Sequence, residues 1–209
     1  MPYLSLILLA VAALLVILLI FWLKKNQNSK KTLTMDSFSG LLATTAPEML
    51  AESFLELWRN SDQAAKKELK GRVLQQGWEA YFLTDLYSQD RKKRMKAIEI
   101  LGCLGGEKSF WPLMEMLASQ DAELSFSGTA ALMDLEAPAQ LRNLVLAFRE
   151  PRKWPPARVA EVLLKKGPAV RPLLKKELTE GNEESKRLTA DLLTEMELEG
   201  GEKFALSDW

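Results

Sequence analysis

Residues 90–105 read DRKKRMKAIEILGCLG, and this segment carries the clearest structural signal in the chain. Asp90 is a residue type that favours helix N-caps, because its carboxylate accepts hydrogen bonds from the first free backbone amides. Arg94 follows four residues later and Leu101 eleven residues later, both at helical spacing. The segment closes on Gly-x-Leu-Gly, where a helix is expected to stop. The pattern predicts a capped helix that begins just after Asp90.

The same frame recurs along the chain, with drift. Its copies start at residues 62, 90, 121, 153 and 182, so the steps are 28, 31, 32 and 29 residues. Apolar stripes between these starts predict a partner helix for each of the last four copies. We expect these partner helices at 78–87, 109–118, 138–149 and 168–178. Most glycines lie where helices should end, at positions 77, 105, 106, 167, 181 and 200. A period near 30 that divides into two helices indicates an α-solenoid.

The segment 90–105 resembles the second helix of a HEAT repeat, in the short form found in phycobilisome-lyase-like HEAT proteins. The resemblance extends over roughly residues 47–198 and is clearest in one repeat. A basic residue at the fourth position recurs at Lys66 and Lys186, whereas Ser125 and Ala157 depart from it. The resemblance implies about five stacked helical hairpins whose second helices line a concave binding face.

An apolar segment precedes the repeats. Residues 3–23 read YLSLILLAVAALLVILLIFWL and contain no charge. As a helix they would span roughly 30 Å, the thickness of a hydrocarbon core. Tyr3 and Trp22 lie at the two ends, where aromatic rings favour the membrane interface. A cleaved signal peptide is the competing interpretation, but no Lys or Arg precedes the segment and no small-residue cleavage site follows it.

The lysines after this segment predict its orientation. Lys24, Lys25, Lys30 and Lys31 follow it, so the positive-inside rule places the bulk of the chain in the cytoplasm. The same lysines could contact anionic lipid head groups. We therefore expect a single-pass protein of the cell membrane with a cytoplasmic C-terminal domain, an organisation that favours a bacterial source.

The predicted fold class is all-α, with one N-terminal transmembrane helix followed by an α-solenoid of about five HEAT-like helical hairpins. The expected divisions are an anchor at 1–25, a flexible linker at 26–46, the repeat domain at 47–198 and a C-terminal tail at 199–209. The linker is rich in polar residues and carries at most a short helix near Phe38 to Leu42.

Composition excludes several kinds of site. The 209 residues include no histidine and one cysteine, Cys103, so histidine-dependent catalysis and His- or Cys-rich metal clusters are ruled out. Lys plus Arg equals Asp plus Glu at 28 each, which argues against a general nucleic-acid binder. Cys103 is expected to be a buried filler rather than a reactive thiol. No catalytic set was found, so we expect neither an enzyme nor a bound cofactor.

Charge is segregated along the repeats. Residues 141–176 hold ten basic side chains against two acids, and residues 177–209 hold ten acids against three bases. A second basic cluster lies at the start of the segment 90–105. The candidate partner-binding residues are Arg91, Lys92, Lys93, Lys96, Arg152, Lys153 and Arg158. Solvated helix faces and salt bridges between repeats are the alternative explanation.

Four tryptophans of the repeats have two interpretations. Trp58, Trp78, Trp111 and Trp154 lie near helix ends and suit packing between repeats, although a binding hot spot would also use them.

Three functions remain open at this point. The first is a membrane-tethered scaffold that binds a protein partner, such as an acidic segment or another membrane protein's cytoplasmic domain. The second is an enzyme of the kinds known among HEAT-like proteins, a bilin lyase or an alkyl-base DNA glycosylase. The third is a sensor of anionic membrane surfaces that uses residues 141–176.

Overall fold

The computed structural model describes residues 34–134 and 137–205, with side chains described as far as Glu197. Within these residues every regular element is a helix and there is no strand, which confirms the all-α class. The predicted anchor and its flanking residues Tyr3, Trp22, Lys24, Lys25, Lys30 and Lys31 lie outside the described residues. Among the helices that are described, none has the length and apolar character needed to cross a membrane.

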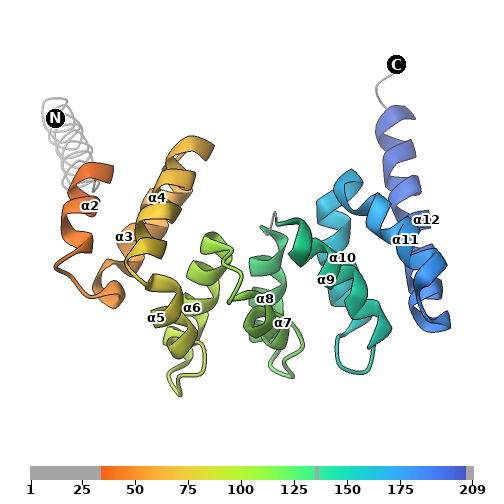
Figure 1. The fold of residues 1–209 in the computed structure, drawn as a ribbon, viewed down its shortest axis with the longest axis horizontal. Coiled ribbons are helices and arrows are strands. Elements are labelled where there is room, and N and C mark those ends of the chain that lie inside the picture. Colours follow the sequence, from red (N-terminus) through yellow and green to blue (C-terminus); the bar gives the residue numbers. More distant parts are fainter. Residues whose placement is uncertain (1–33, 135–136, 206–209) are drawn as a thin grey trace, which may run out of the picture.

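The helices form an extended row, which Figure 1 shows from the N-terminal end to the C-terminal end. In chain order they are α2 (Met35–Leu42), α3 (Pro47–Asn60), α4 (Gln63–Gln75), α5 (Trp78–Asp85), α6 (Arg91–Leu104), α7 (Phe110–Leu117), α8 (Ala122–Met133), α9 (Pro138–Leu146), α10 (Pro156–Lys166), α11 (Arg171–Glu180) and α12 (Glu183–Ala205). Two 3-10 turns, η1 (Ala147–Arg149) and η2 (Gly167–Val170), follow α9 and α10. The arrangement is consistent with an α-solenoid.

Helix starts follow the predicted caps. The carboxylates of Asp62, Asp90 and Asp121 accept hydrogen bonds from backbone amides of the first turns of α4, α6 and α8, at 2.8 to 2.9 Å. Each bond satisfies an amide that the helix itself leaves free. Gly105 ends α6 with φ +51°, in the left-handed region where a Cβ is unfavourable. The predicted starts of these three helices and the predicted end of α6 are therefore confirmed.

Neighbouring helices approach closely where the sequence supplies small residues. A Cβ built on Gly102 of α6 would lie 2.8 Å from the Ala131 Cα of α8. A Cβ on Gly128 of α8 would lie 2.5 Å from the Leu117 nitrogen of α7. These glycines let the helices pack nearly backbone to backbone.

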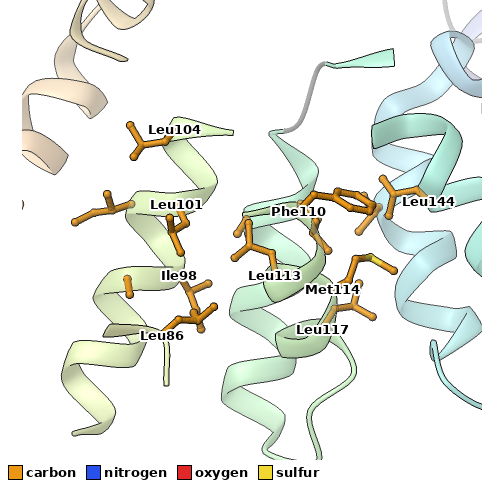
Figure 2. Packing of buried hydrophobic residues seen from close by; sticks show 14 of the residues in the cluster. Leu86, Ile98, Leu101, Leu104, Phe110, Leu113, Met114, Leu117 and Leu144 are labelled. Carbon is orange, nitrogen blue, oxygen red and sulfur yellow. The ribbon is translucent and has the colours of Figure 1, made fainter. Parts of the chain in front are cut away.

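A continuous apolar core runs between the helices. Figure 2 shows Ile98 and Leu101 of α6 beside Leu113 of α7, with Phe110 on the far side reaching Leu144 of α9. These five side chains are all buried. Each hairpin therefore buries its apolar face on the next, as expected when single repeats cannot fold alone.

The N-terminal boundary of the folded domain corrects the predicted linker. Residues 35–42 form helix α2, which includes the short helix expected near Phe38 to Leu42, but Phe38 is completely buried rather than part of a flexible linker at 26–46. Its ring lies 6.4 Å from the Phe54 ring and 6.0 Å from the Trp78 ring, between centroids. The second half of the predicted linker therefore belongs to the domain, because α2 covers an aromatic cluster that α3 and α5 would otherwise expose.

The first predicted repeat also needs correction. The frame that starts at Asp62 implied that α4 would take the second-helix position next to α6. Instead α3 runs alongside α6, and their side chains pair in parallel order: Glu48 with Lys93 (3.0 Å), Glu52 with Lys96 (2.7 Å) and Arg59 with Glu99 (2.5 Å). Helix α4 is an additional helix between α3 and α5 that contacts α5 and α6.

The C-terminal helix is longer than predicted. A stop was expected at Gly200, with a tail from residue 199, but α12 continues through both Gly200 and Gly201 to Ala205. Glycine lowers helix propensity by only about 1 kcal/mol relative to alanine, so an established helix can pass through it.

Candidate binding groove

An open groove of about 840 Å³ lies on one face of helices α3, α6 and α8. Its position follows from the parallel packing of these three helices, with α6 in the middle and the other two as walls. Leu55 and Trp58 come from α3, Met95 and Cys103 from α6, and Phe126 from α8. We call this the α3–α6–α8 groove.

Phe126 is the unusual apolar residue of the groove. Its side chain is 60% exposed although it belongs to a helix packed on both sides. On the opposite wall, Trp58 is half-buried and packs its ring 5.7 Å from the Phe54 ring. An exposed aromatic ring inside a concave surface suits the burial of a partner's apolar side chain better than it suits solvent.

Ion pairs between neighbouring helices surround these apolar residues. Lys96 contacts Glu52 and Arg59 contacts Glu99 across α3 and α6. Arg91 contacts Glu123 across α6 and α8. These charges cancel in pairs, so they add little net charge to the groove.

The pKa values that are shifted near this face report pairing rather than catalytic tuning. The hydrogen bond from Lys93 lowers the pKa of Glu48, and the hydrogen bond to Glu99 raises the pKa of Arg59. Burial raises the pKa of the Cys103 thiol to about 12. At neutral pH each of these groups keeps its ordinary protonation state, and the Cys103 thiol is not nucleophilic.

A second hollow of about 450 Å³ continues the groove under α4. It shares Trp58, Cys103 and Asp134 with the first hollow. Helix α4 adds three lysines to its lining, Lys66, Lys67 and Lys70. Of these, Lys66 lies over the Trp58 ring, with its nitrogen 5.6 Å from the ring centroid.

The groove brings together only some of the predicted partner-binding residues. Arg91, Lys92 and Lys96 line it. Lys93 lies on the same helix but pairs with Glu48 outside the lining.

The other three predicted residues lie away from the groove. Arg152 and Lys153 are in the turn before α10, where the Lys153 nitrogen lies 4.6 Å from the Trp154 ring centroid. Arg158 pairs with Glu161 one turn further along α10, at 3.0 Å. The predicted set is therefore not one surface.

Three bases of the segment 141–176 are engaged in contacts between helices. Arg149 donates two hydrogen bonds to Glu177, of 2.7 and 2.8 Å, and Glu177 is only 3% exposed. Arg171 donates to the Met196 carbonyl at 3.1 Å, and Lys166 donates to the Met133 carbonyl. The excess of bases in this segment therefore overstates the charge that it offers to a partner.

The tryptophans divide between the core and the surface. Trp78 and Trp154 are buried in the core. Trp58 lines the groove, whereas Trp111 is 48% exposed on α7 and stacks beside Trp154 at 5.9 Å.

Sequence reasoning missed Phe126, Arg59 and the three lysines of α4. A signal for Phe126 existed: α8 carries no charge from Leu124 to Met133, and Phe126 lies off the buried stripe formed by Leu124, Gly128 and Leu132. No comparable signal placed α4 over the groove, because its position depends on contacts far along the chain.

No group of His, Cys, Asp or Glu side chains in the described ranges could hold a metal ion. The sequence matches no known family and no curated protein. Among solved structures it is similar to the crystal structure of an engineered protein, with 16% identity over 77% of this chain and 78% of that chain. The TM-score is 0.39, too low to support a structural argument.

Proposed function

We propose that this protein is a membrane-tethered helical scaffold whose α3–α6–α8 groove holds a segment of a protein partner at the cytoplasmic face of the membrane. The observation that carries the proposal is Phe126, a 60% exposed aromatic side chain set in an open groove of about 840 Å³. Buried aromatic anchors of this kind dominate the energy of protein interfaces, while ion pairs around them form a polar rim.

We also infer that the hairpins are HEAT-like. Two polar positions of the frame in residues 90–105 act at the turn before α6. Asp90 caps the helix, and Arg94 folds back to donate hydrogen bonds to the Ser88 and Gln89 carbonyls at 2.7 and 3.2 Å. Both polar positions of the frame therefore stabilise the turn that precedes α6.

The tether rests on sequence. The uncharged segment 3–23 is long enough to span a bilayer, and four lysines follow it. A tether raises the effective concentration of the scaffold near other membrane proteins, so moderate affinity in the groove is sufficient.

Site-specific photocrosslinking tests the function. A photoreactive phenylalanine replaces Phe126 in the full chain, made in the source cells, and a second variant carries it in place of Trp111. Trp111 is a matched control because it is also an exposed aromatic residue, at 48%, but lies on α7 away from the groove. We expect a discrete protein adduct from position 126 and none from position 111. Absence of an adduct at 126, or equal adducts at both positions, contradicts the proposal.

The tether has its own test. After alkaline carbonate washing of cell membranes, the full chain should stay with the membrane pellet, because a spanning apolar helix resists extraction. Recovery of the chain in the supernatant contradicts the tether but leaves the groove untouched.

A further inference from the structure

We propose that the segment held in the groove is acidic and carries one bulky apolar side chain, which packs against Phe126 while its carboxylates reach the lysines of α4. This inference rests on the proposed function and specifies the partner's chemistry.

Most charged residues of the α3–α6–α8 groove are already in ion pairs. The three interhelical pairs of the groove, Arg59 with Glu99, Lys96 with Glu52 and Arg91 with Glu123, neutralise each other. A partner charge placed there would compete with an existing pair and gain little.

The remaining charges of the two connected hollows are mostly positive. They are Lys66, Lys67, Lys70 and Lys92 against one acid, Asp134. Within the described residues, Lys67, Lys70 and Lys92 have no ion pair. Four positive charges against one negative charge favour an acidic partner, which gains charge complementarity without breaking a pair.

Most of these lysines belong to one helix. Three of them come from α4, the helix that the parallel row of α3, α6 and α8 does not require. The hollow under α4 also meets the ends of α6 and α8, through Gly105 and Asp134. Helix C-termini disfavour an anion, so the lysines are the feature that makes this end suitable for carboxylates.

The groove also offers apolar side chains to a partner. Phe126 on one wall, Trp58 on the other and Met95 of α6 all line the groove. A methionine side chain adapts readily to the shape of a partner side chain. Because Trp58 lines both hollows, the apolar contact and the lysines of α4 adjoin each other. A single short segment can therefore use both.

An unbiased peptide selection tests the assignment. The probe is a random library of 16-residue peptides, selected against the full chain in mild detergent and sequenced, with the best peptide then synthesised for anisotropy titrations. We expect enrichment of Asp and Glu together with Phe, Leu or Trp. The charge reversal K67E/K70E should weaken binding of the selected peptide by about tenfold or more at low salt. The control K165E/K175E reverses two exposed lysines outside both hollows and should leave affinity within about twofold.

The variant F126S separates the two proposals. Peptides whose binding is lost in F126S but unaffected by K67E/K70E, and which are neutral or basic, overturn the acidic assignment and leave the groove as a binding site. Failure to enrich any peptide that depends on Phe126 overturns both. Light scattering that shows a dimer of the full chain, abolished by F126S, assigns the groove to a second copy and overturns the acidic partner. Circular dichroism of each variant confirms that the helices remain.

Discussion

The N-terminal and C-terminal parts of the domain use similar charges in different ways. From α3 to α8 the bases and acids face an open groove, and several lysines there remain unpaired. From α9 to α12 several bases are engaged by neighbouring helices, with Arg149 on the buried Glu177 as the clearest case. A basic cluster in a repeat sequence therefore stays available to a partner only where the neighbouring helix does not supply its counterion.

The helices in the middle of the row and those at its N-terminal end pack in different ways. The middle of the row relies on small residues, since Gly102 and Gly128 allow close approach. The N-terminal end relies instead on large aromatic rings, with Phe38, Phe54 and Trp78 in mutual contact. Helix α2, the first described helix, covers the side of the first hairpin that faces away from the row.

The largest predicted effect concerns this cover. Phe38→Ala should lower the free energy of unfolding by about 3–5 kcal/mol, because it removes a completely buried ring from the aromatic cluster. Leu41→Ala, at a partly exposed position in the same helix, is the matched control and should cost less than about 1 kcal/mol. Urea unfolding of the full chain in mild detergent measures both. Equal small losses would restore residues 35–42 to a linker.

A smaller effect is expected where α7 meets α8. Gly128→Ala should cost about 2–3 kcal/mol, because the new methyl group would meet the backbone of Leu117 at 2.5 Å. Gly71→Ala is the control, since nothing lies within 4 Å of its Cβ position in α4. That change should stabilise the chain by about 0.5–1 kcal/mol through helix propensity. A neutral Gly128→Ala would show that the seam between the two helices is loose.

The C-terminal part is tested through its buried ion pair. Arg149→Met leaves Glu177 buried with only the Ser185 hydroxyl as a donor, and should cost about 2–3 kcal/mol. Lys176→Met removes a pair with Glu180 at the surface and should cost less than about 0.5 kcal/mol. If both variants unfold at the same urea concentration, the ion pair of Arg149 contributes no more to stability than the surface pair of Lys176.

The same pair gives a pH dependence. Burial raises the pKa of Glu177, but hydrogen bonds from Arg149 and Ser185 outweigh it, so its pKa lies below the ordinary value of 4.5. A folded-state pKa below the unfolded one stabilises the protein above the unfolded pKa, and the contribution is lost as pH falls through the folded pKa. Wild-type chain should therefore lose more stability than Arg149→Met between about pH 7 and pH 3. Parallel losses for the two proteins would contradict the assignment.

The smallest effect on stability is expected for an ion pair of the groove. Arg59→Met breaks the pair with Glu99, in which both side chains are about half exposed, and should change stability by less than about 0.5 kcal/mol. Because the change leaves a free carboxylate in the groove, it should weaken binding of an acidic peptide while stability holds. A large loss of stability would mean that the interhelical pairs hold the groove together.

Local features of the fold were predictable from sequence. Asp90 and Asp121 predict helix starts, because capping depends only on a side chain and the backbone amides two or three residues away. The all-α class follows from apolar spacing alone.

Features that depend on distant contacts were not predictable. Helix α3, rather than α4, packs beside α6 through contacts between residues far apart in the chain, such as Arg59 and Glu99, which are 40 residues apart. Periodicity predicts that two helices form, but it does not decide which of them packs against the next repeat. The fate of Arg149 was hidden for the same reason, since its partner Glu177 belongs to another hairpin.

Helix α4 stands over only one end of the groove, so the two ends differ in chemistry. A segment lying along α6 would meet lysines at one end and the paired Arg91 at the other. Reversing the segment would put its carboxylates at the wrong end, so binding would have a preferred polarity. Under the proposed function, the remainder of a bound protein would then always leave the groove at the same end.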